Sequence, residues 1–139
     1  MKTTRINRAA PAPAEDIEHY CRGLDGWPRS WMGMEKDVPP GERLVTCFRP
    51  FIEYLVTSSD LSSKTIQKHV DNLWLLGGEL IRDLNETPSL RRKDAVAVLR
   101  QLIGDDGGPL IHAGNSEEAQ RHFDSTCRKL HRFLTTPPC

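Results

Sequence analysis

The chain has 139 residues, and its 19 lysines and arginines balance its 19 aspartates and glutamates. This length accommodates one domain with an ordinary hydrophobic core, and zero net charge excludes a strong general attraction to polyanions or to an anionic membrane surface. No run of about 20 apolar residues is present, and residues 1–8 lack the apolar core of a secretory signal, so we expect no membrane span and a cytoplasmic protein.

Two segments precede the predicted helical body. Residues 1–14 are rich in Ala and Pro and have little to bury, so we expect a disordered tail. Residues 15–42 predict a short helix that begins at Glu15 and stops before Gly23, followed by an irregular segment with several Gly and Pro residues. We interpret this segment as a lid that lays Trp27 and Trp31 on the helical domain, because large aromatic side chains are usually buried.

The helical domain is predicted over residues 43–134. From Gly41 onward the apolar residues follow helical spacing, and Pro50 must either kink this helix or begin a second one. Thr87-Pro88 marks the start of a third helix, whose apolar residues continue to Ile103.

A long helix is expected over about residues 63–84, because Ser62 or Ser63 is suited to cap it and apolar residues recur at helical spacing. The Gly77-Gly78 pair lies inside this helix. Each glycine costs roughly 1 kcal/mol relative to alanine. We therefore expect another helix to pack closely against the backbone at this point, with a hinge as the alternative.

The last helix has the clearest signals. Ser116 is suited to cap it, Glu117 and Glu118 lie in its first turn, and its apolar side runs from Ala119 to Leu134. No alternating pattern long enough for a sheet is present. The sequence therefore predicts an all-α fold, a compact bundle of four to five helices.

Basic residues suggest a surface for phosphates. In the last helix Arg121, Arg128 and Arg132 form one stripe opposite the apolar side. Cations near the start of the third helix oppose the helix dipole, which an external anion would relieve. The candidate nucleic-acid contacts are Lys64, Lys68, Arg91, Arg92, Lys93, Arg121, Arg128 and Arg132.

We expect no metal, no cofactor and no catalytic centre. His122 and His131 are nine residues apart, which turns them about 180° away from each other on one helix, so they cannot join Cys127 around a single ion. The turn around Asp105 and Asp106 lacks the lysine of a phosphate-binding loop. No nucleophile beside a base is evident either.

Part of the chain resembles the core-binding domain of tyrosine recombinases, the phage-integrase and Xer family. The resemblance covers roughly residues 43–134 and rests on residues 51–55, the Leu61-Ser62-Ser63-Lys64-Thr65-Ile66 motif, Leu73 and residues 127–134. It implies a compact four-helix, SAM-like domain that clamps one side of a DNA duplex. The chain departs from the family at His69, where an aromatic residue is common, and at the glycine pair; the recombinase catalytic domain has no counterpart here.

Two functional hypotheses follow. The first is a non-catalytic helical module that holds double-stranded DNA by its phosphate backbone. The second is a protein-interaction module, an accessory factor or inhibitor, that uses Trp27, Trp31, Met32 and Met34 as an apolar surface. Zero net charge favours the second hypothesis, and the arginine stripe favours the first.

Overall fold

The computed structural model describes residues 14–111 and 116–135. Its six α-helices are α1 (Ala14–Tyr20), α2 (Trp27–Trp31), α3 (Val38–Thr57), α4 (Ser63–Glu86), α5 (Ala95–Leu102) and α6 (Glu117–Thr135). Three 3-10 helices, η2 (Leu24–Gly26), η3 (Glu35–Asp37) and η4 (Pro88–Arg92), connect them. The described residues contain no strand, so the predicted all-α fold is confirmed. The SAM-like type remains a prediction, and the predicted tail lies almost entirely outside the described residues.

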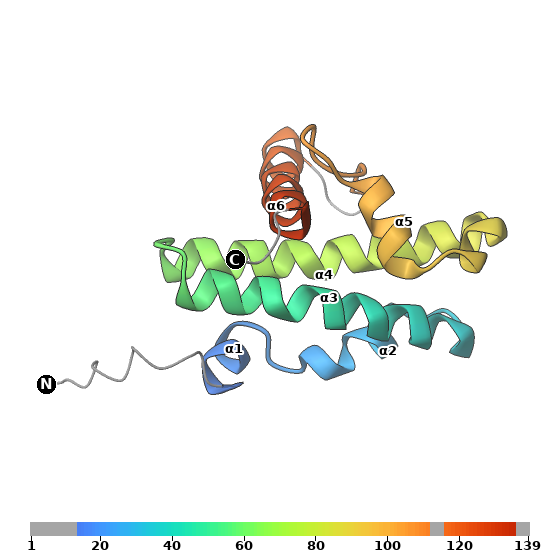
Figure 1. Cartoon of the computed structure of the whole chain (residues 1–139), viewed down its shortest axis with the longest axis horizontal. Coiled ribbons are helices and arrows are strands. Elements are labelled where there is room, and N and C mark those ends of the chain that lie inside the picture. Colours follow the sequence, from blue (N-terminus) through green and yellow to red (C-terminus); the bar gives the residue numbers. More distant parts are fainter. Residues whose placement is uncertain (1–13, 112–115, 136–139) are drawn as a thin grey trace, which may run out of the picture.

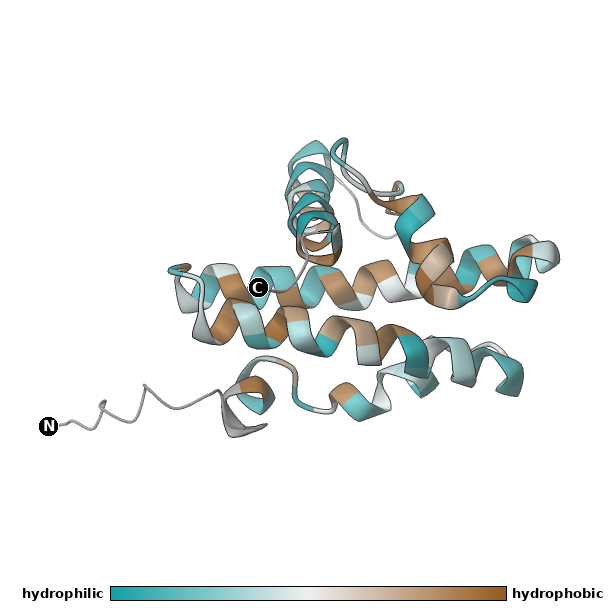
Figure 2. Ribbon diagram, in the orientation of Figure 1, coloured by the Kyte–Doolittle hydropathy of each residue, from teal (hydrophilic) through white to brown (hydrophobic). Residues whose placement is uncertain are grey.

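Helices α3 and α4 form a long antiparallel pair at the centre of the molecule (Figure 1). Helices α5 and α6 lie on one side of this pair, and α1 and α2 lie on the other. Apolar residues line the surfaces where these helices meet, and polar residues cover the outer surfaces (Figure 2). The largest fully buried side chains are Phe48, Phe51 and Phe123, from α3 and α6. None of the described helices is long and apolar enough to cross a membrane.

Side-chain caps fix where three helices begin. Ser62 accepts a hydrogen bond from the Thr65 amide at 3.2 Å, and Ser116 accepts one from the Ala119 amide at 3.0 Å. Both caps confirm the predicted starts of α4 and α6. The predicted third helix is wrong at its start, because Pro88 begins a separate 3-10 helix and α5 begins only at Ala95. Asp94 sets the start of α5, because its side chain accepts a hydrogen bond from the Val96 amide and caps this helix.

The segment around the tryptophans is more helical than expected. Residues 24–31 and 35–37 form η2, α2 and η3, and α3 already begins at Val38. Pro50 lies inside α3 and does not start a second helix, so that alternative is excluded. Pro28 and Pro39 occupy the first turns of α2 and α3, where a missing amide proton leaves no helical hydrogen bond unmade.

Trp31 explains Gly77, the first glycine of the pair inside α4. A Cβ atom built on Gly77 would lie 2.2 Å from Cζ2 of the Trp31 indole, whereas one on Gly78 would lie 3.5 Å from Cδ1. The Trp31 Nε1 atom also donates a hydrogen bond to the Trp74 carbonyl at 2.9 Å. The expected close packing against the α4 backbone is therefore made by a side chain of the short helix α2.

We predict that Gly77→Ala destabilises the protein by about 1–3 kcal/mol, because the added methyl group overlaps the Trp31 ring and forces it to move. Gly78→Ala is the matched control. Its Cβ would make an ordinary contact, so this variant should be neutral or stabilising by up to about 1 kcal/mol through helix propensity. Urea unfolding of both variants measures the difference, and equal stabilities would contradict the proposed packing role of Gly77.

Candidate nucleic-acid interface

A buried polar cluster joins α4 and α6 where the two helices cross. His69 Nδ1 and Thr126 Oγ1 are hydrogen-bonded at 2.6 Å, and the Asn72 side-chain amide donates to Thr126 Oγ1 at 2.9 Å. The same amide nitrogen lies 3.0 Å from His122 Nδ1. The two imidazole rings stack with their centroids 5.3 Å apart. These four side chains fix how α6 lies on α4, because each polar group depends on a partner from the other helix.

Both histidines of this cluster are held in the neutral form. Burial, together with the nearby His122 and Lys129, lowers the pKa of His69 to about 4. Burial also lowers the pKa of His122, and Lys68 adds to this effect. The positive charge of Lys129 on α6 thus lowers the pKa of His69, and that of Lys68 on α4 lowers the pKa of His122.

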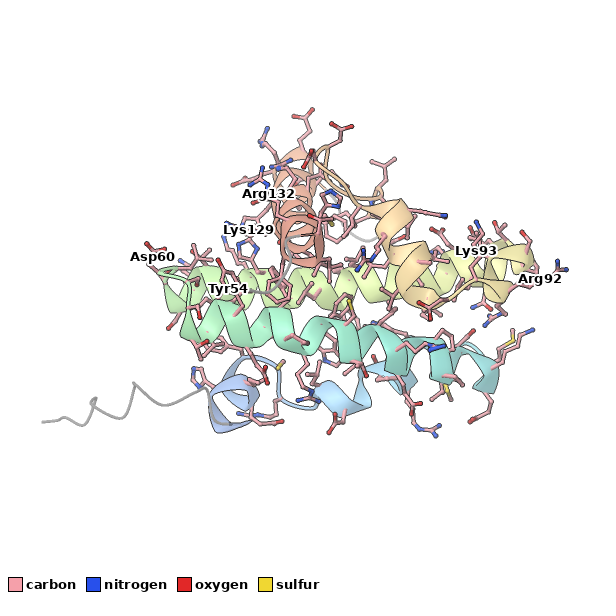
Figure 3. The ribbon with its side chains drawn as sticks, viewed as in Figure 1. Tyr54, Asp60, Arg92, Lys93, Lys129 and Arg132 are labelled. Atoms are coloured by element: carbon pink, nitrogen blue, oxygen red, sulfur yellow. The ribbon has the colours of Figure 1, made fainter. Side chains whose placement is uncertain are left out.

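Several cations lie on α4 and α6 outside the apolar sides of these helices, and we call them the basic face. Lys64 and Lys68 are exposed on α4, one turn apart. Lys129 and Arg132, which are labelled in Figure 3, belong to α6. The basic face comprises Lys64, Lys68, Arg121, Arg128, Lys129 and Arg132. Five ion pairs of the described residues involve arginines elsewhere in the molecule: Arg29, Arg43, Arg49, Arg82 and Arg91.

Arg91 has a structural role that the sequence did not reveal. Its guanidinium forms an ion pair with Asp37 at 2.6 Å, and the Asp37 side chain is fully buried. Burial alone would raise the pKa of Asp37, but hydrogen bonds from Arg91, from Asn85 and from two backbone amides outweigh it, so the pKa is lowered. Arg91 therefore ties η4 to η3, and we remove it from the candidate nucleic-acid contacts.

Arg92 and Lys93 lie at the far end of α4 from the α6 part of the basic face (Figure 3). With 24 residues, α4 is about 36 Å long, so the predicted cations form two separate groups. Arg91 and Arg92 also occupy the last turn of η4. We expected these cations to lie in the first turn of the third helix and to oppose its dipole. This expectation is wrong, because η4 ends at Arg92 and α5 begins only after its N-cap, Asp94.

The four residues predicted as an apolar partner surface do not share one environment. Trp27 is buried, with 9% of its surface exposed, and Trp31 packs on Gly77. Met32 is half-buried, and Met34 is 46% exposed. The exposed tryptophan of the described chain is instead Trp74 of α4, at 41%.

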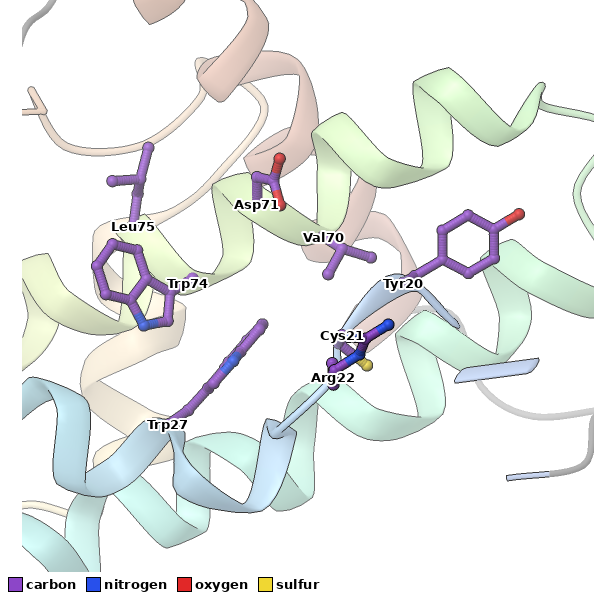
Figure 4. A pocket seen from close by; sticks show the side chains of 8 residues that line it. All are labelled: Tyr20, Cys21, Arg22, Trp27, Val70, Asp71, Trp74 and Leu75. Carbon is purple, nitrogen blue, oxygen red and sulfur yellow. The ribbon is translucent and has the colours of Figure 1, made fainter. Parts of the chain in front are cut away.

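A pocket of about 540 Å³ lies between α4 and the segment that connects α1 to α2. Figure 4 shows Trp27 and Trp74 near one end of this pocket and Tyr20 near the other, with Arg22 and Asp71 projecting from opposite sides. Gln67 links the two walls, because its side-chain amide donates to the Tyr20 carbonyl and to Asp71 Oδ1. We call this the aromatic pocket.

Two further observations bear on the chemistry of the chain. No group of three His, Cys, Asp or Glu side chains within residues 14–111 and 116–135 is arranged to hold a metal ion. The histidine cluster was missed at the sequence level, although one signal was present: Thr126 and His69 are polar residues on the otherwise apolar faces of their helices. The partner of each is 57 residues away, which no local pattern reveals.

We predict that folding stability decreases as the pH is lowered from 7 to 5. In the unfolded chain His69 has the ordinary histidine pKa of 6.5 and binds a proton below it, whereas the folded chain resists protonation down to about pH 4. The stability is therefore complete above about pH 6.5, and roughly 2 kcal/mol should be lost by pH 5. Urea unfolding at several pH values measures this change.

The variant His69→Asn keeps a nitrogen or oxygen atom near the Thr126 hydroxyl but cannot titrate, so its stability should depend less on pH in this range. His131→Asn on the same helix pair lies outside the cluster and should retain the wild-type dependence. Identical pH profiles for the wild type and His69→Asn would contradict the assignment to His69.

The chain matches no family model, no curated protein and no solved structure. The resemblance to the core-binding domain of tyrosine recombinases therefore remains a prediction from the sequence. What the molecule binds has to be inferred from the contacts and charges of α4, α6 and the aromatic pocket.

Proposed function

We propose that this chain is a non-catalytic helical module that holds the phosphate backbone of nucleic acid on its basic face. The observation that carries the proposal is the hydrogen bond of 2.6 Å between His69 and Thr126, which fixes where α4 crosses α6. Lys68 is the neighbour of His69 and Lys129 follows Thr126 by one turn, so both helices carry a cation close to this crossing. An anion bound at this crossing would be attracted by cations of both helices.

The beginning of α4 strengthens this interpretation. Lys64 is the second residue of α4, at the positive end of the helix dipole, where a cation is unfavourable and an anion is stabilised. On α6, Arg128, Lys129 and Arg132 extend the same positive region. A phosphate chain offers regularly spaced anions to such a surface, and arginine and lysine side chains are the usual phosphate contacts in protein–DNA complexes.

Zero net charge does not oppose a local phosphate site. Arginines outside the basic face, such as Arg49 and Arg91, form ion pairs with the carboxylates of Asp25 and Asp37. These carboxylates thus neutralise cations in other parts of the molecule. Attraction to a polyanion depends on the local charge at distances within the screening length of about 10 Å.

We predict that the protein binds a labelled mixed-sequence DNA duplex in a fluorescence-anisotropy assay and that binding weakens steeply between about 50 and 200 mM salt. Lys68→Gln combined with Lys129→Gln should weaken binding at low salt. The slope of the logarithm of the binding constant against the logarithm of salt should decrease in magnitude by about 2, because each phosphate contact contributes about one unit.

The matched control is Arg92→Gln combined with Lys93→Gln, which removes the same charge at the far end of α4. This control should retain the wild-type slope. Equal losses in both double variants would indicate a response to net charge alone, and failure of the wild type to bind either the duplex or a single strand at low salt would refute the proposal. Circular dichroism checks that both double variants keep the helical fold.

A further inference from the structure

Trp74 is exposed and yet held in place. Its Nε1 atom donates to Ser30 Oγ at 3.0 Å, and its backbone carbonyl accepts from Trp31 Nε1. Ser30 Oγ in turn donates to the Trp27 carbonyl at 2.6 Å, which fixes the acceptor. An indole that is 41% exposed and anchored at its only polar atom presents a preorganised apolar face at the wall of the aromatic pocket.

The polar groups of the aromatic pocket suit a flat ring with N–H groups at its edge. Asp71 Oδ1 already accepts from Gln67, which orients the carboxylate. The described structure shows no ion pair between Asp71 and Arg22, although both line the pocket. A carboxylate can accept from the amino group of a base, and an arginine can stack on it or contact its phosphate.

The aromatic pocket adjoins the basic face along one strip of α4. Lys64, Lys68, Asp71 and Leu75 are spaced by four, three and four residues, so they follow one another on the same side of the helix. Tyr20, at the end of the pocket toward the start of α4, donates a hydrogen bond from its hydroxyl to Ser63, the residue before Lys64. A strand whose phosphates lie on Lys64 and Lys68 would therefore place its next base beside the pocket.

We propose that the aromatic pocket receives an unpaired nucleobase, stacked on Trp74, from a nucleic acid whose phosphates lie on the basic face. This inference rests on the proposed function and adds the class of nucleic acid, because only a single-stranded or locally unpaired segment can offer a free base. Sequence-tolerant binding of single strands commonly combines these two elements, a positively charged path for the backbone and aromatic side chains for the bases. A volume of about 540 Å³ is within the usual range of small-ligand pockets.

The test compares two probes of equal phosphate number, a short single-stranded oligonucleotide of mixed sequence and an oligomer made only of abasic sites. The wild type should bind the base-containing strand about tenfold or more tightly, because stacking adds to the phosphate contacts. Trp74→Ala should remove this preference and leave binding of the abasic oligomer unchanged. Ser30→Ala is the control, because it removes the hydrogen bond to Trp74 but keeps the indole. This variant should therefore lose less of the preference than Trp74→Ala does.

The outcomes separate this inference from the proposed function. Equal binding of both probes by the wild type would overturn base stacking while leaving the phosphate surface intact, and this comparison needs no variant to fold. It is also the result expected if a protein partner occupies the pocket. A preference that persists in Trp74→Ala would place the base elsewhere and overturn the assignment. Binding of neither probe at low salt would refute both proposals.

Discussion

The insertion of the Trp31 indole against Gly77 is the contact on which the aromatic pocket depends. It fixes α2 on α4, since no side chain intervenes between the ring and the helix backbone. The same approach lets Trp31 donate to the Trp74 carbonyl and brings Ser30 to the Trp74 ring. The walls of the aromatic pocket are therefore set by a close approach that only glycine permits, and loss of this contact would release Trp74 as well as destabilise the fold.

Helix α4 connects the core to the basic face and to the aromatic pocket, because each of its sides has a different neighbour. Its apolar residues, such as Leu73 and Leu80, are fully buried, while His69 and Asn72 meet α6 through hydrogen bonds. The remaining side carries Lys64 and Lys68 and borders the aromatic pocket. The backbone of a helix packed on several sides sets the spacing of its solvent-facing residues, and regular spacing favours recognition of a regularly spaced ligand.

The net charge of the chain is zero, but its positive and negative side chains are not all paired with one another in the same way. The ion pair of Arg91 with the buried Asp37 joins two connecting segments, and exposed pairs such as that of Arg49 with Asp25 join others. On α6, Lys129 lies near the buried His69, whose pKa is lowered chiefly by burial. Cations placed next to neutral polar groups keep their field, whereas cations paired with carboxylates lose most of it, so the total charge of a chain does not predict its local potential.

Local signals in the sequence determined the all-α fold, the caps at Ser62 and Ser116, and the apolar sides of α4 and α6, because these depend on residues within one or two turns. The glycine pair also predicted a close neighbour, though not which one. Only the tertiary structure decided that Arg91 belongs to Asp37, that Trp27 is buried while Trp74 is exposed, and that Lys68 and Lys129 flank one cluster. Each of these pairings joins residues more than 40 positions apart or depends on which neighbour covers a helix side, and the period of a helix specifies a face but not the partner that packs on it.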